Sequence, residues 1–184
     1  MEAPEVMTKT KWTIDPAHSE IGFKVKHLMF ANVRGSFKEY SATAYTPGED
    51  FTSAEIDVRI NAASVNTGIE QRDDHLRSAD FFDTEQFKEI VFTASKLHTA
   101  NEEGQFVLNG ELTMRGVTKQ IQLNVEMGGI IKDPWGAEKA LFSISGKINR
   151  KEWGLNYNTL LETGGVLVSE DVWIQCEVQL VKQV

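Results

Sequence analysis

The side chains of this chain that are best suited to chemistry are its four histidines, His18, His27, His75 and His98. A histidine can bind a metal ion or transfer a proton near neutral pH. No two of the four have the His-Glu-x-x-His spacing of a zinc protease, and the single cysteine, Cys176, does not make a cysteine-rich zinc site. We therefore expect neither a metal site nor a cofactor.

His27 has the most informative sequence neighbours of the four. It alternates with Ile21, Phe23 and Val25 on one face of a predicted strand that runs from His18 to Leu28, and charged residues take the other face. An imidazole at this place either satisfies a backbone group near the end of the strand or presents a polar group inside a cavity. His18 and His75 are expected to have hydrogen-bonded structural roles, and His98, beside a polar turn, is expected at the surface.

Charged residues also concentrate between Arg72 and Arg77, in the stretch Arg-Asp-Asp-His-Leu-Arg. Asp73 and Asp74 would point in different directions on a helix, so they do not form a pair of catalytic carboxylates. A solvated helix face with local ion pairs is the favoured interpretation. The alternative is a site in which Arg72, His75 and Arg77 bind the polar or anionic head of a ligand.

Composition and missing motifs exclude several classes of protein. The P-loop and Gly-x-Ser-x-Gly signatures are absent, which disfavours a nucleotide enzyme or a serine hydrolase. The 19 basic and 27 acidic residues give a net charge of −8, which opposes nucleic acids and anionic membrane surfaces. No apolar run is long enough to span a membrane, so we expect no membrane insertion. The N-terminal residues do not have the pattern of a secretory signal, which favours a cytoplasmic location, or a periplasmic one if the chain is a mature form.

The elements that must position these residues are strands, because apolar and polar residues alternate along most of the chain. After a short strand at Trp12–Ile14, eight principal strands are predicted at residues 18–28, 31–46, 51–60, 89–98, 104–114, 119–127, 137–150 and 171–181. Short turns join nearly all of them, which indicates antiparallel neighbours. The prediction is an all-β protein, in which residues 1–10 form a flexible arm and residues 11–184 form a single eight-stranded antiparallel barrel domain.

One segment interrupts the strands. Residues 66–82 are too polar for a buried strand and are predicted to form a helical connection across one end of the barrel, capped near Asn66 or Thr67.

The interior of such a barrel can be a solid core or an elongated pocket. Gly35, Gly110 and Gly146 fall on the apolar faces of their strands, where they would leave room inside. This favours a pocket, although periodicity alone does not separate the two possibilities.

In its motifs the chain resembles the YceI-like family, bacterial lipocalin-like barrels described as polyisoprenoid-binding. The resemblance runs from about Trp12 to Leu180 and rests on a series of motifs in order: Trp12-Thr-Ile-Asp-Pro-Ala-His-Ser19, Val33-Arg-Gly-Ser-Phe37, Arg72-Asp-Asp-His-Leu-Arg-Ser-Ala-Asp-Phe-Phe-Asp83, Gly110-Glu-Leu-Thr-Met-Arg-Gly-Val-Thr118, Glu152-Trp-Gly-Leu155 and Leu161-Glu-Thr-Gly-Gly-Val-Leu-Val-Ser169.

The resemblance implies an extended barrel that binds, transports or stores a polyisoprenoid, a quinone-like lipid or a fatty amphiphile in its lumen, and it implies no catalytic residues. The tail would lie among apolar side chains, and the head would lie near His27, Arg72 and His75. The predicted ligand-binding residues are Ile21, Phe23, Val25, His27, Val33, Phe37, Ile56, Val58, Arg72, His75, Phe92, Leu112, Leu123, Phe142 and Ile144.

The sequence is also compatible with two other functions. One is an enzyme that acts on a small hydrophobic substrate, with His27 or His75 as an acid or base in the barrel. The other is a solid-cored interaction domain. Unpaired strand edges at the seam of the barrel would favour a homodimer.

Overall fold

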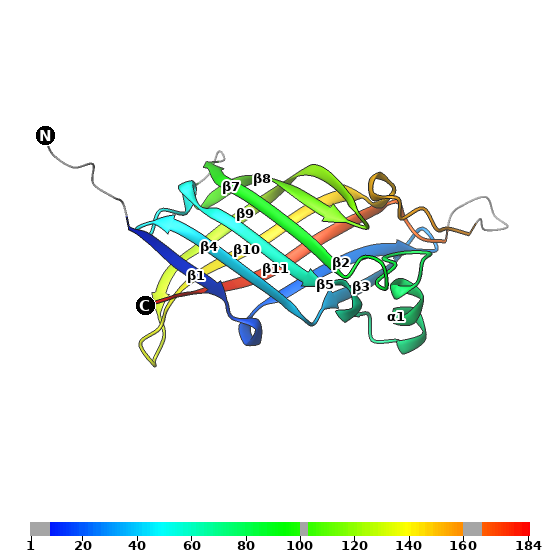
Figure 1. The fold of residues 1–184 in the computed structure, drawn as a ribbon, viewed down its shortest axis with the longest axis horizontal. Coiled ribbons are helices and arrows are strands. Elements are labelled where there is room, and N and C mark those ends of the chain that lie inside the picture. Colours follow the sequence, from blue (N-terminus) through cyan, green and yellow to red (C-terminus); the bar gives the residue numbers. More distant parts are fainter. Residues whose placement is uncertain (1–7, 100–102, 160–166) are drawn as a thin grey trace, which may run out of the picture.

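The computed structural model describes residues 8–99, 103–159 and 167–184, and most of them lie in antiparallel strands (Figure 1). The strands are β1 (Lys9–Ile14), β2 (Glu20–His27), β3 (Ala31–Phe37), β4 (Tyr40–Pro47), β5 (Glu55–Asn61), β6 (Val65–Asn66), β7 (Glu89–Thr99), β8 (Gln105–Met114), β9 (Val117–Lys132), β10 (Glu138–Asn149) and β11 (Asp171–Lys182). The helices are α1 (Glu70–Arg77) and four short 3-10 helices, η1 (Pro16–His18), η2 (Phe51–Ser53), η3 (Ala62–Ser64) and η4 (Arg150–Trp153).

The sheet closes on itself as a barrel. Its strands follow the order β1-β4-β5-β7-β8-β9-β10-β11, and β11 then pairs with β1. The edge of β11 that meets β1 also continues along β2, so that Ile14 pairs with Leu180 and Ile21 with Cys176. β1 and β2 therefore act as one interrupted wall strand, and the predicted eight-stranded antiparallel barrel is confirmed. The β2–β3 hairpin extends along the long axis of the barrel toward the end that carries α1 (Figure 1).

Side-chain hydrogen bonds interrupt two of the predicted strands. The predicted strand 31–46 divides into β3 and β4 at Lys38 and Glu39. The Lys38 amide donates to the Ser64 carbonyl and the Glu39 amide donates to the Ser64 hydroxyl, instead of to a neighbouring strand. The predicted strand 51–60 begins with the 3-10 helix η2, whose Asp50 cap accepts a hydrogen bond from the Thr52 amide at 3.0 Å. In both places a short polar side chain offers the backbone an alternative to the ladder.

The helix is shorter than the predicted segment 66–82. It ends at Arg77 because its last carbonyls are taken locally: the Ser78 hydroxyl donates to His75 O at 2.6 Å, and the Phe82 amide donates to Leu76 O at 2.9 Å. The expected cap at Asn66 or Thr67 is wrong, because the N-cap position is Ile69, which makes no capping side-chain bond.

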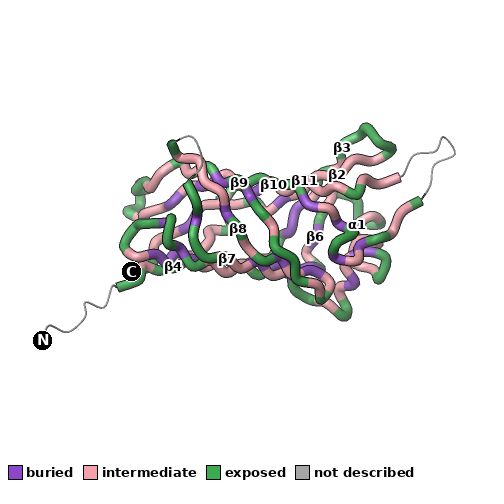
Figure 2. Tube along the Cα trace, turned by 90° about the horizontal axis from the view of Figure 1, so that it is seen from above, coloured by how far each residue is buried: buried purple, intermediate pink, exposed green. Residues whose placement is uncertain are grey.

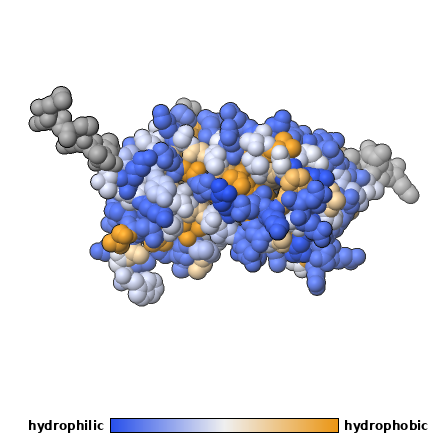
Figure 3. All heavy atoms as spheres, in the orientation of Figure 1, coloured by the Kyte–Doolittle hydropathy of each residue, from blue (hydrophilic) through white to orange (hydrophobic). Residues whose placement is uncertain are grey.

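Along most strands buried or half-buried residues alternate with more exposed ones, and buried residues also lie near α1 (Figure 2). On the face shown in Figure 3 the surface is mainly hydrophilic, and apolar side chains are visible in its middle. Within the described ranges, no helix has the length and apolar character needed to cross a membrane.

Some predictions concern residues that are only partly described. Residues 1–7 of the predicted arm lie outside the described residues, and Lys9 and Thr10 are the first residues of β1. Of the motif at 161–169, residues 161–166 also lie outside the described residues.

Candidate functional site

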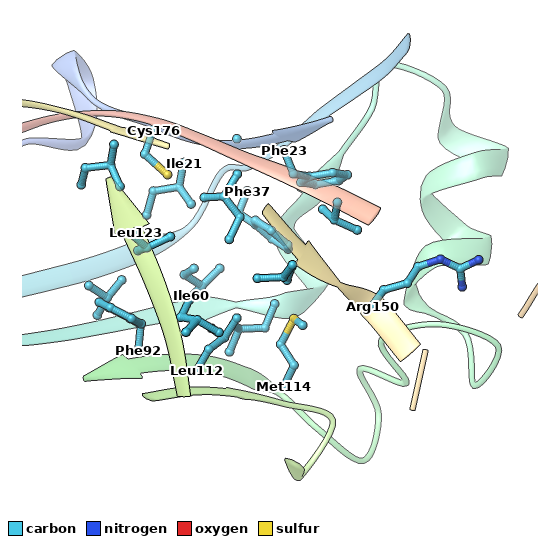
Figure 4. A pocket seen from close by; sticks show the side chains of 18 of the residues that line it. Ile21, Phe23, Phe37, Ile60, Phe92, Leu112, Met114, Leu123, Arg150 and Cys176 are labelled. Carbon is cyan, nitrogen blue, oxygen red and sulfur yellow. The ribbon is translucent and has the colours of Figure 1, made fainter. Parts of the chain in front are cut away.

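A cavity of about 500 Å³ lies inside the barrel, and its walls are almost entirely apolar. Many inward-facing side chains, such as Phe23, Ile56 and Val58, are only half-buried although they point to the interior. Their accessible surface faces the cavity instead of bulk water. In Figure 4 side chains from β2, β3, β7, β8 and β9 converge on the same space. The interior is therefore a lumen of the size that binds small molecules, and not a solid core.

Three glycines in the barrel wall leave space into which neighbouring large side chains fold back against the wall. A Cβ atom at Gly35 would collide with the ring of Phe23, and one at Gly110 would lie 2.5 Å from Cζ of Phe92. One at Gly146 would lie 2.6 Å from Cδ2 of Leu123. The space at the glycines is thus filled by side chains that would otherwise extend further into the lumen. This is how glycines on the apolar faces widen the cavity.

Aromatic packing occupies the end of the lumen opposite α1. The ring of Phe51 lies 5.0 Å from Trp12 and 5.0 Å from Phe142, measured between centroids. Trp12 is fully buried, and its indole N–H donates to the Thr46 hydroxyl at 2.9 Å. This cluster of Trp12, Phe51 and Phe142 makes the end tightly packed.

The end of the lumen next to α1 is more polar. His75 lines the cavity there, and its ring lies 4.7 Å from Tyr157 and 5.1 Å from Phe81 in edge-to-face contacts. Its Nε2 atom is 2.9 Å from an oxygen of Asp80, and 41% of its side chain is exposed. Because His75 faces both the lumen and solvent, the cavity reaches the surface at this end.

Arg72 and Asp73 stabilise the turn that precedes α1. Arg72 donates to the Thr67 hydroxyl at 2.7 Å and to the Thr67 carbonyl at 2.8 Å, and the buried Asp73 accepts hydrogen bonds from the Thr67 amide and hydroxyl. The interpretation of this stretch as a fully solvated face is therefore wrong for Asp73, because it is buried. Arg77 does not line the cavity and donates instead to the backbone of Ala63 and to Asp74.

Arg150 is the buried cation of the site, with 3% of its surface exposed. Its guanidinium lies 6.0 Å from the ring of Phe81 and donates to the carbonyls of Leu155, Val168 and Ser169. Burial lowers the pKa of the guanidinium from its usual value, and the charge of Glu170 opposes this shift. Arginine stays charged in proteins, so the cation ties η4 to the segment before β11.

A thiol and an imidazole also line the mainly apolar lumen. The Cys176 thiol faces it from β11, and burial raises the pKa of that thiol to about 11. His27 lines it at the end of β2, and among the described residues its imidazole makes no side-chain hydrogen bond. The position of His27 therefore corresponds to a polar group inside a cavity.

The fifteen residues predicted to bind a ligand all line this one cavity. Their contact with a ligand stays a prediction. His18 and His98 lie outside it and are exposed. Sequence reasoning missed Arg150 and Tyr157, which stand beside irregular segments where no alternation marks an inward face. It also left out Cys176, which the alternation of β11 does place on the inner face.

Metal binding has no support in the described part of the chain. Within residues 8–99, 103–159 and 167–184, no three His, Cys, Asp or Glu side chains come together in a way that could hold a metal ion.

An eight-stranded antiparallel barrel around an apolar lumen defines a lipocalin-like class of protein. Within that class the chain belongs to the YceI-like family, whose YceI-like domain model matches residues 12–180. It is similar to a UPF0312 protein of Staphylococcus aureus (strain USA300), with 38% identity over 164 residues that make up 89% of this chain and 92% of the relative.

Solved structures share the fold. A Campylobacter jejuni YceI protein is 34% identical, with all of both chains covered and a TM-score of 0.72. A domain of Saccharophagus degradans, described as polyisoprenoid-binding and implicated in plant cell wall breakdown, has a TM-score of 0.68 at 17% identity, covering 94% of this chain and 98% of that one.

Proposed function

We propose that this protein binds one long-chain amphiphile, a polyisoprenoid or a quinone-like or fatty lipid, in the barrel lumen, and that it carries or stores this lipid without chemical change. The observation that carries the proposal is the apolar cavity of about 500 Å³. The Saccharophagus degradans domain with the same fold, described as polyisoprenoid-binding, supports it.

The two ends of the lumen differ, which favours one orientation of the lipid. The tail would reach toward the aromatic cluster of Trp12, Phe51 and Phe142, where it would pack against apolar side chains. The head would stay near His75 and Tyr157, where the cavity reaches water. A polar head placed at the aromatic end would lose its hydrogen bonds to water without replacement.

Tail length should decide affinity. Each buried methylene contributes about 0.8 kcal/mol, or roughly a fourfold gain in affinity. The cost of association lies in the range of about 4–15 kcal/mol, so about five buried carbons offset its lower bound and about nineteen offset its upper bound. Few polar groups face the lumen, and discrimination between head groups should accordingly be weak.

An acid or base inside the barrel has less support. The carboxylate partner of His75 is Asp80, and both side chains are partly exposed at the surface. A dyad that worked on a buried substrate would instead direct its hydrogen-bonded groups into the lumen.

Native mass spectrometry of gently purified protein, followed by organic extraction, tests the proposal directly. A series of isoprenoid alcohols of increasing length should bind with affinity that rises with each added unit. Val58→Trp, which fills the lumen, should abolish binding, whereas Arg59→Trp, one position along β5 and outside the barrel, should leave it unchanged. Repeated absence of bound or exchangeable lipid, or equal binding by both variants, contradicts the proposal.

A further inference from the structure

The turn of the β2–β3 hairpin exposes three consecutive apolar side chains, which we call the tip. Leu28 is 53% exposed, Met29 64% and Phe30 86%. Figure 2 shows this turn in green, projecting at the end of the barrel that carries α1. Contiguous exposed apolar residues are unfavourable in water and mark surfaces that contact something else.

The backbone of the turn does not account for these residue types. Leu28 and Met29 have φ values of 52° and 67°, and the Phe30 amide donates to the His27 carbonyl at 3.3 Å, as in a type I′ turn. Asparagine and glycine are preferred at both central positions, because a positive φ is strained for a bulky side chain. Neither burial nor turn geometry therefore explains the leucine and methionine.

A basic face adjoins the tip on the outside of the same hairpin. It consists of Lys24, Lys26 and Arg34, with Trp173 of β11 beside them. Lys24 and Arg34 are directly opposite each other in the ladder, an arrangement that destabilises a hairpin through like-charge repulsion. The Nζ atoms of the two lysines lie 5.3 and 6.0 Å from the centroid of the Trp173 ring.

The basic face contrasts with the charge of the whole chain. Residues 21–38 contain four basic residues and no acidic one, which leaves 15 basic against 27 acidic residues in the rest of the sequence. Two carboxylates near this end are already paired: Glu170 with Lys151 at 2.8 Å, and Asp80 with His75 at 2.9 Å. An anionic partner that neutralised the basic face would relieve the repulsion within it.

We propose that the tip and the basic face dock the barrel on an anionic phospholipid surface. The tip enters the headgroup region, and the lysines and arginine contact lipid phosphates. Apolar groups beside cations, with a tryptophan at the boundary, match the layered chemistry of a bilayer interface. A second copy of this chain is a poorer occupant, because a symmetric contact would bring two basic faces together.

Docking would also place the lumen next to the bilayer. Val25, His27 and Val33 lie on the inner face of the same hairpin and line the cavity. A lipid could then pass between bilayer and lumen over a short path. This step rests on the proposed function, whereas docking itself does not.

Vesicle sedimentation of the full chain tests docking, with vesicles of phosphatidylcholine alone and of phosphatidylcholine mixed with phosphatidylglycerol. The wild type should bind the mixed vesicles, and added salt should weaken this binding. The tip variant, Leu28→Asn with Met29→Asn and Phe30→Ser, keeps residues that tolerate the turn and should lose roughly tenfold or more in partition coefficient. Lys24→Gln with Arg34→Gln should lose about fivefold per removed cation on mixed vesicles only.

The control is Trp135→Ser, which removes an aromatic side chain that is 88% exposed in the turn between β9 and β10. It should bind vesicles like the wild type. Failure of the wild type to bind mixed vesicles, or an equal loss in the control, overturns the proposal. The proposal is also overturned if sedimentation velocity shows that the wild type is a dimer and the tip variant a monomer. Lumen binding, measured separately by native mass spectrometry, should be the same in the tip variant and the wild type.

Discussion

The side chain of Leu123 covers Gly146 so closely that a Cβ atom at the glycine would lie 2.6 Å from Cδ2 of Leu123. Gly146→Ala should therefore push the leucine side chain into the lumen, because the leucine is the flexible partner of the contact. We expect affinity for a long-chain lipid to fall by about fourfold, the equivalent of one buried methylene. Competition titration with a fluorescent lipid measures this change.

Gly128→Ala is the matched control for that experiment. A Cβ atom there would meet Leu141 Cβ at 3.5 Å, an ordinary contact, and Gly128 does not line the lumen. Its lipid affinity should equal that of the wild type. A fourfold loss in both variants would show that the effect comes from the strands and not from the lumen.

The Cys176 thiol should be slow to react. Burial raises the pKa of this thiol from 9.0 to about 11, which reduces the thiolate fraction at a given pH by about a hundredfold. Iodoacetamide labelling followed by mass spectrometry should show this slow rate in the folded protein, an ordinary rate after unfolding in guanidinium, and further protection when a lipid fills the lumen. Labelling of the folded protein at the unfolded rate contradicts the position of Cys176.

Alternation of apolar and polar residues was sufficient to predict the wall of the barrel. On β5, for example, Ile56 and Val58 both line the lumen, as their two-residue spacing requires. Strand length was harder to predict, because the break between β3 and β4 depends on Ser64, which lies far along the chain and replaces the ladder at Glu39. A local pattern contains no information about such a partner.

The polar end of the lumen could be predicted only in part. His75 was found through its charged neighbours, whereas Arg150 follows a strand end and looks like a surface residue. Its burial results from three backbone carbonyls, two of which lie 18 and 19 residues further along the chain. Tertiary contacts of this kind override the usual preference of arginine for the surface.

Removal of the Arg150 side chain should cost more stability than removal of an exposed arginine. Arg150→Ala leaves the carbonyls of Leu155 and Ser169 without their donor, whereas the Val168 carbonyl keeps its hydrogen bond from Asn158, and we expect a loss of about 2–4 kcal/mol in the free energy of unfolding. Arg59→Ala, which breaks only exposed ion pairs on β5, should cost at most about 1 kcal/mol. Urea denaturation of both variants decides the comparison, and equal losses would contradict a structural role for Arg150.

Asp15 should make stability depend on pH in the acid range. It caps η1 between β1 and β2, and its second oxygen lies 2.8 Å from His18 Nδ1 and 3.0 Å from Lys139 Nζ. The hydrogen bond from His18, together with Lys139, holds the pKa of this carboxyl below its usual 3.8 although burial acts in the opposite direction. Asp15→Asn should lower the free energy of unfolding at neutral pH by about 1–2 kcal/mol.

The direction of the pH effect follows from the lowered pKa. The folded protein binds the Asp15 proton more weakly than the unfolded chain, so stability from this group is present above pH 3.8 and is lost as pH falls through the lower folded pKa. The difference in the free energy of unfolding between wild type and Asp15→Asn should therefore shrink as pH falls below about 4, and it should vanish only below the lower folded pKa. Asp50→Asn is the control, because Asp50 also caps a 3-10 helix but has no ion pair among the described residues, and asparagine caps as well as aspartate. Its cost should be small and independent of pH, whereas a constant difference between wild type and Asp15→Asn at every pH would show that the contacts of Asp15 with His18 and Lys139 do not depend on its charge.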